Sequence, residues 1–365
     1  MLNTGHTAPP LSFLRMIRHT LLLLALSPFF SFRLAAEDGL LARFAHKLTE
    51  PKVYACRPTH GPITIDGRLD EPDWQRADRT DLFVDIQGEG HPRPKYATTA
   101  RLLWDADHLY IAATLEEPNV TARLRQRDTI IWKENDFEVF LDPEGRGIDY
   151  YEWEVNARNT MMDLLLTHPY RAGGEFLLSW DCTGLRHAVQ VDGTLNDSRD
   201  TDRGWTVEMA IPIRSLRKNF RNTEGAKAGE VWRLNFSRVE WLHPEGPEEN
   251  WVWSPCGEIA MHMPERWGYL CFLNEGEAPT LPAHHAEHRL LWALYYAQEA
   301  HRARTGAFAT SLAELGCTAA DRATLTPDAR LSLEATVSRF VLRVTLSDGR
   351  TLSLDERGQW DEQVP

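Results

Sequence analysis

The fold of this chain is decided by two short runs, Asp136-Phe-Glu-Val-Phe-Leu-Asp142 and Tyr151-Glu-Trp-Glu-Val-Asn156. In both runs apolar and polar residues alternate, which is typical of β-strands with one buried face. Phe137 and Trp153 then share the apolar face with their alternate neighbours, and Glu138 lies on the other. We therefore predict two strands with a dry face and a wet face rich in carboxylates.

Similar strand-like runs continue on both sides of this pair, over residues 98–104, 108–115, 185–191, 204–211, 231–236 and 268–272. They are short and are separated by turn signals such as Asp105-Ala-Asp107. Many short strands at regular spacing indicate a two-sheet structure. The predicted fold class is mainly β, an antiparallel β-sandwich of the immunoglobulin or jelly-roll kind, over residues 53–275.

A linker at Asn274–Pro282 ends this region, because its Pro, Gly and acidic residues cannot continue a strand. Beyond it the pattern predicts a helix from His284 to about Thr305, stopped by Gly306, then a short helix at 311–315 and strands over 330–334, 340–346 and 351–354. Residues 283–365 therefore form a small α+β domain in this interpretation. Its sequence resembles the helix and loop of pilin-like globular domains. An extracellular protein is a candidate partner for this domain.

Residues 1–36 have the order of a Sec export signal: Arg15 and Arg18, then an apolar run, then Ala35-Ala36. The apolar run is too short to span a bilayer, so we expect a periplasmic or extracellular product with no membrane span after signal removal. Residues 37–52 are interpreted as a polar lead-in. A formal net charge of -13 argues against a nucleic-acid partner, since phosphate binding needs clustered Lys and Arg.

Thirteen tryptophans are a further signal, because the flat indole face stacks well on the C–H face of a sugar ring. Most of them are nevertheless expected in the core. The five cysteines show no C-x-x-C zinc spacing. An odd number leaves at least one thiol unpaired, and several are expected to be buried small hydrophobes.

A series of short sequence motifs, in a fixed order, resembles carbohydrate-binding module family 9. The motifs are Ile63–Trp74, Ala100–Asp105, Asp136–Asp142, Glu154–Asn156, Val207–Pro212 and Pro264–Gly268. The resemblance covers about 220 residues and implies a sandwich whose sugar is held between two Trp rings with polar groups on its hydroxyls. It also implies that the first and last strands are neighbours, so Cys56 and Cys271 form the expected disulfide if one exists.

On this resemblance Trp132 falls close to the first sandwiching Trp, Glu138 on the strand carboxylate and Asn156 on the strand amide. Glu154 stands where the family has Arg, and the second Trp falls near Met261, with His262 beside it. The implied pocket is therefore altered, and the family's preference for chain ends of plant polysaccharides is not carried over.

The alternation of residues adds Glu152 to this set. We predict a saccharide site of Trp132, Glu138, Glu152, Glu154, Asn156 and His262, in which an aromatic platform is combined with polar groups. The alternative is an ordinary solvated face whose carboxylates pair with Arg158 or Arg238.

The sequence leaves three other roles open. The resemblance implies a structural calcium, for which Asp66, Asp70 and Asp142 are the candidate ligands, although acidic turns are often simply solvated. Related sandwiches hold haem b, and the conceivable ligands are Met161, Met162, His168, Met261, His262 and Met263. An accessory role beside a glycoside hydrolase is the third, with catalysis in this chain not expected because no nucleophile motif is present. The favoured function is saccharide binding in support of polysaccharide use, without enzymatic activity.

Overall fold

The computed structural model describes residues 39–216, 225–243 and 245–365, so the predicted export signal lies outside the described residues. The strands of the larger sheet are β1 (Val53–Pro58), β2 (Val84–Asp85), β3 (Thr98–Trp104), β4 (His108–Glu116), β5 (Asp136–Asp142), β6 (Tyr150–Asn156), β7 (Met161–Leu166), β8 (Phe176–Leu177), β9 (Arg186–Asp192), β10 (Gly204–Pro212), β11 (Val231–Glu240), β12 (Glu249–Val252) and β13 (Gly268–Phe272). Short helices precede β1 or connect the strands: α1 (Leu40–Arg43), α2 (Pro72–Arg76) and α3 (Ile213–Leu216). The 3₁₀ turns of this part of the chain are η1 (Ala45–Lys47), η2 (Ile131–Lys133), η3 (Tyr170–Ala172) and η4 (Pro264–Arg266). The protein is mainly β, as predicted.

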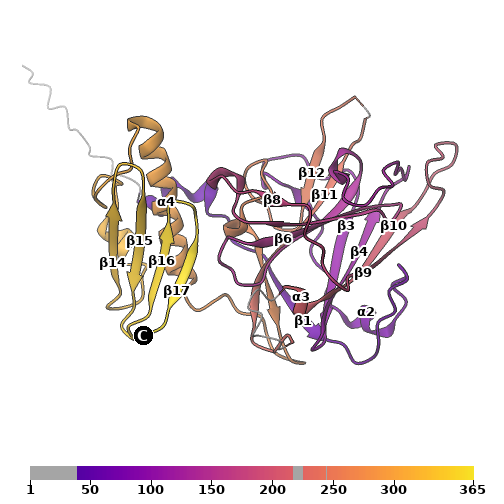
Figure 1. Ribbon diagram of the computed structural model, residues 1–365, viewed down its shortest axis with the longest axis horizontal. Coiled ribbons are helices and arrows are strands. Elements are labelled where there is room, and N and C mark those ends of the chain that lie inside the picture. The colour runs from indigo at the N-terminus through magenta and orange to yellow at the C-terminus, as the bar shows by residue number, and fades with distance from the viewer. Residues whose placement is uncertain (1–38, 217–224, 244) are drawn as a thin grey trace, which may run out of the picture. The chain divides into compact units, whose positions relative to one another are not determined.

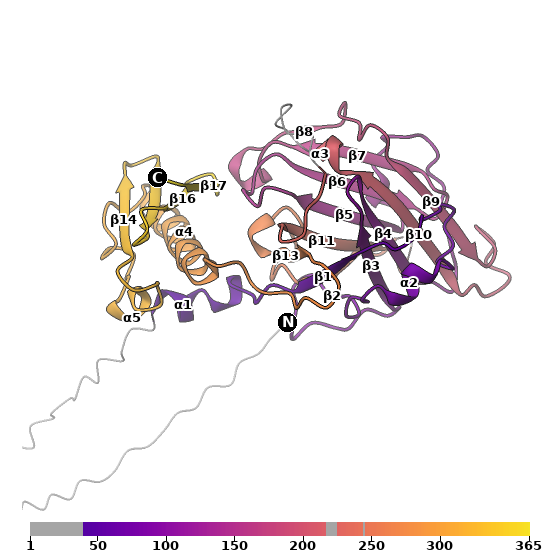
Figure 2. The ribbon, with the colours of Figure 1, turned by 90° about the horizontal axis from the view of Figure 1, so that it is seen from below.

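The larger sheet curls (Figure 1). Its strands follow the order β8-β7-β6-β5-β11-β13-β1-β3-β4-β10-β9. Strands β12 and β2 extend it beside β11. Figure 2 shows this order around the sandwich, from β7 through β5 and β1 to β10. Two curled halves of one sheet therefore enclose the core.

The predicted β-sandwich is confirmed, and its pairing is antiparallel except at β1. Val53–Cys56 pairs in parallel with β13, and Arg57 and Pro58 pair in parallel with β3, so the sheet is mixed. One strand thus changes partner along its length and joins the two halves. Alternation of apolar and polar residues predicts a strand but not its direction relative to its neighbours. The parallel pairing of β1 could therefore not be predicted from the sequence.

The core between the two halves takes the apolar face of β5 and β6, as the alternation predicted. Phe137, Val139 and Trp153 are fully buried there, packed with residues of β4 and β10 such as Ile111 and Val207. The opposite face of β5 and β6 is not wet, however. Phe140, Tyr150, Met162, Met261 and Trp267 form a second apolar cluster on that side and cover much of it.

All five cysteines are free, so the predicted Cys56–Cys271 disulfide is absent. Strands β1 and β13 are neighbours as expected, but their register pairs Ala55 with Cys271 and Cys56 with Phe272. Cys56 therefore belongs to the core between the halves, and Cys271 belongs to a cluster on the other face of the sheet. Two side chains on opposite faces cannot be bridged without backbone movement.

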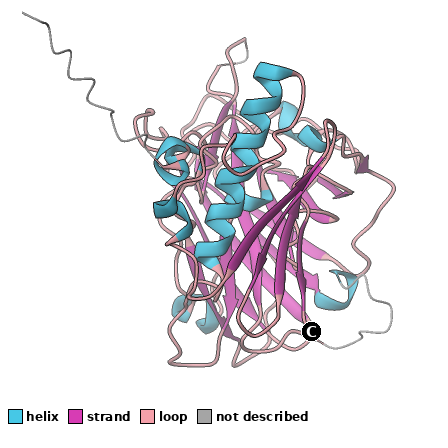
Figure 3. Ribbon diagram, turned by 90° about the vertical axis from the view of Figure 1, so that its left-hand side faces the viewer, coloured by secondary structure: helices cyan, strands magenta, loops and turns pink. Residues whose placement is uncertain are grey.

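The second sheet contains β14 (Arg330–Ala335), β15 (Phe340–Thr345), β16 (Thr351–Asp355) and β17 (Trp360–Gln363), all antiparallel neighbours in that order. Helix α4 (His285–Thr305) lies against it (Figure 3), and Gly306 ends the helix with a left-handed φ of 83°. The short helix predicted at 311–315 is a turn, and a one-turn helix α5 (Ala319–Arg322) follows instead. This unit has its own apolar cluster, built on Leu290, Leu294, Leu342 and Leu354.

The interpretation of residues 37–52 as a polar lead-in was wrong. Leu40, Phe44 and Leu48 are buried in the same cluster as helix α4. Apolar residues spaced by four are typical of one face of a helix, so the sequence contains a signal for this burial. Because residues Asp38–Pro365 form one compact unit, the domain bounds 53–275 and 283–365 stay a prediction. No helix in the described part of the chain has the length and apolarity needed to cross a bilayer.

Candidate functional site

A pocket of about 670 Å³ lies over β5 and β6, on the face that points away from the core between the halves. It is called the β5–β6 pocket below. Five of the six predicted saccharide-binding residues line it: Trp132, Glu138, Glu152, Glu154 and His262. The structure thus brings together predicted residues from η2, β5, β6 and the loop that precedes η4.

The floor of the β5–β6 pocket is made by glutamates of adjacent strands. Glu138 on β5 stands directly opposite Glu154 on β6, and Glu152 stands opposite Phe140. At most 5% of each glutamate is exposed, because the apolar cluster around Met261 and Trp267 surrounds them. The predicted solvated face is therefore a recessed acidic floor.

Neither arginine of the alternative prediction pairs with this floor. Arg238 is buried and forms its ion pair with Glu240 at 2.6 Å. The Arg158 side chain donates to the carbonyl of Ala122 at 3.3 Å. Neither Arg158 nor Arg238 therefore neutralises the glutamates of the floor.

Burial is the main cause that raises the pKa of each glutamate in the floor, and repulsion from its neighbours adds to it. The pKa of Glu152 rises to about 8, and those of Glu138 and Glu154 rise well above the ordinary value. Glutamates that keep their protons near neutral pH can donate as well as accept hydrogen bonds. Such groups suit a ligand rich in hydroxyls.

Glu154 also positions Trp132, the aromatic platform of the predicted site. Its Oε2 accepts the backbone N–H groups of Ile131 and Trp132, both at 3.0 Å, and so fixes the 3₁₀ turn η2. The carbonyl of Trp132 accepts the indole N–H of Trp241 at 3.0 Å. With its backbone held on both sides, the Trp132 side chain remains 39% exposed at the pocket.

His262 lies at the other predicted part of the pocket and is neutral near pH 7, because burial lowers its pKa to about 4. Its Nδ1 lies 3.1 Å from the Tyr150 hydroxyl. Its ring meets the edge of Tyr170 with 4.4 Å between centroids. A neutral imidazole in this place can accept or donate one hydrogen bond without adding charge.

Asn156 does not line the β5–β6 pocket. Its amide N–H groups donate to the Leu124 carbonyl and to Glu134, and its carbonyl accepts the backbone N–H groups of Arg158 and Thr160. The side chain is thus fully used in holding loops. Alternation put Asn156 on the correct face of β6, but it lies beyond the end of the recess.

Sequence reasoning missed several pocket residues that lie in loops. Tyr170, Phe176 and Ile259 line the pocket and are 50%, 49% and 69% exposed. Together with Trp132 they give the acidic floor an apolar rim. Only the local phrase His168-Pro-Tyr170 hinted at an exposed aromatic turn, because loop positions carry no periodic signal.

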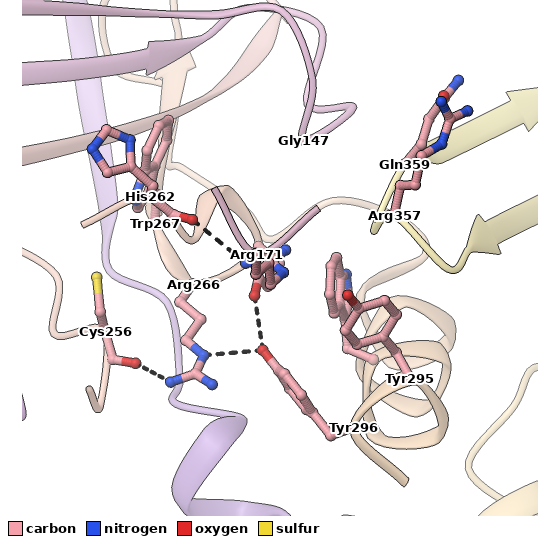
Figure 4. Close-up of polar contacts among 12 residues, drawn as sticks. Gly147, Arg171, Cys256, His262, Arg266, Trp267, Tyr295, Tyr296, Arg357 and Gln359 are labelled. Carbon is pink, nitrogen blue, oxygen red and sulfur yellow. Dashed lines mark hydrogen bonds and ion pairs between the residues drawn. The ribbon is translucent and has the colours of Figure 1, made fainter. Parts of the chain in front are cut away.

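Arg171 ties this rim to helix α4. Its guanidinium donates to Glu265 at 3.0 Å and to the carbonyl of His262 at 3.4 Å, and it lies 5.4 Å from the ring centroid of Trp292. Figure 4 shows Arg171 beside the α4 tyrosines, with Tyr296 also hydrogen-bonded to Arg266. These contacts hold the backbone next to Tyr170 in place.

The predicted calcium ligands do not gather in one group. Asp66 and Asp70 are exposed, and both oxygens of Asp142 accept backbone N–H groups of its own turn, from Gly145 and Gly147. Among the described residues, the carboxylate groups compact enough for a cation are Asp128, Asp163 and Asp181, and Asp136, Glu138 and Glu154. The calcium prediction remains untested.

The residues considered as haem ligands divide between the two faces of the sheet. Met161 belongs to the core between the halves. Met162, Met261 and Met263 line the β5–β6 pocket beside His262. Met161 therefore cannot bind the same haem iron as the residues in the pocket.

A second hollow, of about 570 Å³, lies along β3, β4, β9 and β10. Its lining is mainly threonine and charged residues, and its Trp205 is 2% exposed. It lacks the exposed ring that the β5–β6 pocket has in Trp132.

The curled sandwich with its aromatic rim and acidic floor defines a β-sandwich binding domain. The chain belongs to the carbohydrate family 9 binding domain-like family, whose model matches residues 65–270. The resemblance to carbohydrate-binding module family 9 is thus confirmed. Since the family consists of binding modules and not of catalytic domains, the expectation that the chain is not an enzyme is confirmed with it.

Curated relatives match over part of the chain. Endo-1,4-beta-xylanase C of Paenibacillus barcinonensis is 25% identical over 43% of this chain, and Exoglucanase XynX of Acetivibrio thermocellus is 22% identical over 50%. These matches cover only 12% and 14% of the two relatives. A solved family 9 module from Caldicellulosiruptor kristjanssonii, in complex with cellotriose, is 15% identical, with a TM-score of 0.42, over 63% of this chain and 100% of that one.

Proposed function

We propose that the chain is an exported saccharide-binding protein that holds its ligand in the β5–β6 pocket. One observation carries the proposal: an exposed indole, Trp132, stands at a recess whose floor is made of hydrogen-bonding glutamates. A hydrated sugar gains little from burial alone, so it needs a flat apolar platform together with polar groups that replace its water. Either element alone binds weakly.

The apolar rim extends this platform. The resemblance left the second sandwiching ring unfilled near Met261, and Tyr170 is the exposed ring that packs on the neighbouring His262. We assign Tyr170 as the second aromatic contact. Glu138 and Glu152 then supply hydrogen bonds from the floor, while Glu154 contributes mainly by holding η2.

We further propose that the protein acts outside the cytoplasm in support of polysaccharide use. The order of charged, apolar and small residues over 1–36 supports export. The matched part of two curated relatives, a xylanase and an exoglucanase by name, supports a role beside polysaccharide breakdown. The α+β unit after the linker is the candidate surface for an extracellular protein partner.

The test is a glycan array followed by calorimetric titration of the oligosaccharides that bind. Leu82→Ala is the matched control, because Leu82 is exposed but lines the hollow along β3 and β4 instead. We expect Tyr170→Ala to weaken binding and Leu82→Ala to leave it unchanged. The reverse result would move the site to the other hollow. A visible absorbance spectrum of the purified protein tests the haem alternative, and we expect no Soret band.

A further inference from the structure

The floor of the β5–β6 pocket gathers more carboxyl groups than a neutral sugar requires. Asp136, Glu138 and Glu154 each place one carboxylate oxygen within 4.8 Å of the others. Glu138 and Glu154 are direct cross-strand partners, and like charges in such pairs destabilise a sheet. Glu152 lies on the same strand as Glu154 and adds a further carboxyl to the pocket.

Asp136 is not one of the residues that line the pocket, but its carboxyl group adjoins those of Glu138 and Glu154 and has an unpaired oxygen. The side chain is fully buried, and its Oδ1 accepts the backbone N–H of Val239 at 3.1 Å. Its Oδ2 is buried and has no hydrogen-bond partner among the described residues. A buried polar atom left unpaired costs about 1 to 3 kcal/mol, so a donor that reaches this cluster gains more than one that meets a satisfied surface.

The pocket has no cation committed to this floor in the described part of the chain. The ion pairs there include none between a Lys or Arg and Asp136, Glu138 or Glu154. Lys133 and Arg171 line the pocket: Arg171 is held by Glu265 and lies over Trp292, and Lys133 forms no ion pair with these three carboxyl groups. A positive group on the ligand would therefore meet carboxyl groups that no Lys or Arg neutralises, and it would favour their ionised form.

We propose that the saccharide bound by this protein is cationic, an amino sugar whose protonated amine lies among the carboxylates of Asp136, Glu138 and Glu154 while its ring lies against Trp132. This inference rests on the proposed function and names its ligand class. A tetrahedral ammonium with N···O distances of about 2.8 Å sets its acceptors about 4.6 Å apart, close to the spacing of this cluster. The substitution of Glu154 for the arginine that the family resemblance led us to expect agrees with a ligand of reversed charge.

A divalent metal is the other cation that such oxygens attract, and the surroundings favour the amine. Calcium takes six to eight oxygen ligands as a rule. Here one oxygen of Glu154 is already used by two backbone N–H groups, and the rim of Trp132, Tyr170 and Ile259 is largely apolar. A pocket of about 670 Å³ also has room for a sugar ring.

The test compares three β-1,4-linked trisaccharides that differ only at carbon 2: the glucosamine trimer, cellotriose and the N-acetylglucosamine trimer. Titration calorimetry at about pH 6 keeps the amine charged. A charge-assisted hydrogen bond is about twice as strong as a neutral one, so we expect the glucosamine trimer to bind roughly tenfold tighter than cellotriose. Its binding enthalpy should also vary with the ionisation heat of the buffer, because protonated carboxyls release protons to the solvent when the ammonium arrives.

Two isosteric variants test the location of the amine. Glu138→Gln and Asp136→Asn remove the ionisable group without changing its shape, and we expect both to abolish the preference for the glucosamine trimer over cellotriose. Leu82→Ala serves as the control that keeps the preference. Circular dichroism shows whether each variant folds, and the comparison of ligands on the unaltered protein does not depend on the variants.

The failures of the two proposals can be told apart. Binding of cellotriose as tight as that of the glucosamine trimer would overturn the cationic ligand and leave saccharide binding intact. Tight binding of Ca²⁺ alone, with no preference among the trisaccharides, would make the cluster a metal site and overturn the inference as well. If no saccharide binds at all, the proposed function fails.

Discussion

Replacement of Trp132 by Ala should weaken saccharide binding while leaving the stability of the fold nearly unchanged, so it distinguishes a binding residue from a core residue. A Trp side chain presents roughly 250 Å² of surface, and 39% of Trp132 is exposed. About 100 Å² is therefore available to a ligand, or about half of that when a sugar stacks on one face. At about 25 cal/mol per Å² the loss is about 1.2 to 2.5 kcal/mol, which is roughly an 8-fold to 60-fold weaker affinity.

The same substitution is expected to change the free energy of unfolding by less than about 1 kcal/mol. The backbone contacts of Trp132 with Glu154 and Trp241 do not involve its ring, so η2 keeps its anchors in the variant. Titration calorimetry measures the affinity, and urea unfolding measures the stability. Trp132→Phe is the matched control and should keep most of the affinity. Unchanged binding by Trp132→Ala, or a loss of stability as large as that of a core Trp, would refute the reasoning.

Three other outcomes are expected. Trp153→Ala should lower the free energy of unfolding by about 3 to 5 kcal/mol, measured by urea unfolding, since Trp153 is fully buried between the halves; a small loss would show that the core relaxes. Stability should fall as the pH rises from about 6.5 to about 8, because the raised pKa of Glu152, about 8, makes the folded state bind the proton more tightly than the unfolded chain does. Burial of His262 works in the opposite sense, but only below its unfolded pKa of about 6.5. Denaturation at several pH values checks this, and Glu152→Gln should flatten the slope; a slope of the opposite sign would contradict it. Finally, thiol titration of the unfolded protein should give the same count with and without reductant, since the five cysteines are free; a higher count after reduction would reveal a disulfide.

The strands of the sandwich were predictable because their sequence signal is local. Alternation in 136–142 and 151–156 gave β5, the greater part of β6, and the face on which each side chain lies. The signal failed where pairing decides the outcome. The parallel partners of β1 come from residues far along the chain, and the one-residue offset between Cys56 and Cys271 that excludes a disulfide is a matter of register.

The candidate site shows the same division. Trp132, Glu138 and Glu154 could be predicted from their phrases and from alternation, and the structure brings them together. The sequence could not show that the glutamates are buried, because loop residues such as Met261 cover that face of the sheet. Tyr170 was missed for a related reason: its position depends on the three-dimensional anchor that Arg171 provides.

The change of partner along β1 has a consequence for the order of folding. Hairpins such as β3–β4 and β5–β6 join neighbouring segments and can form as soon as those segments are available. Strand β1 instead waits for β13, because Val53 pairs with Tyr269, and the entropy of closing so long a loop must be overcome first. The halves of the sandwich therefore stay unjoined until nearly all of its sequence has been made. A chain that closes this late can stay extended during synthesis, which is the state that the proposed export would need.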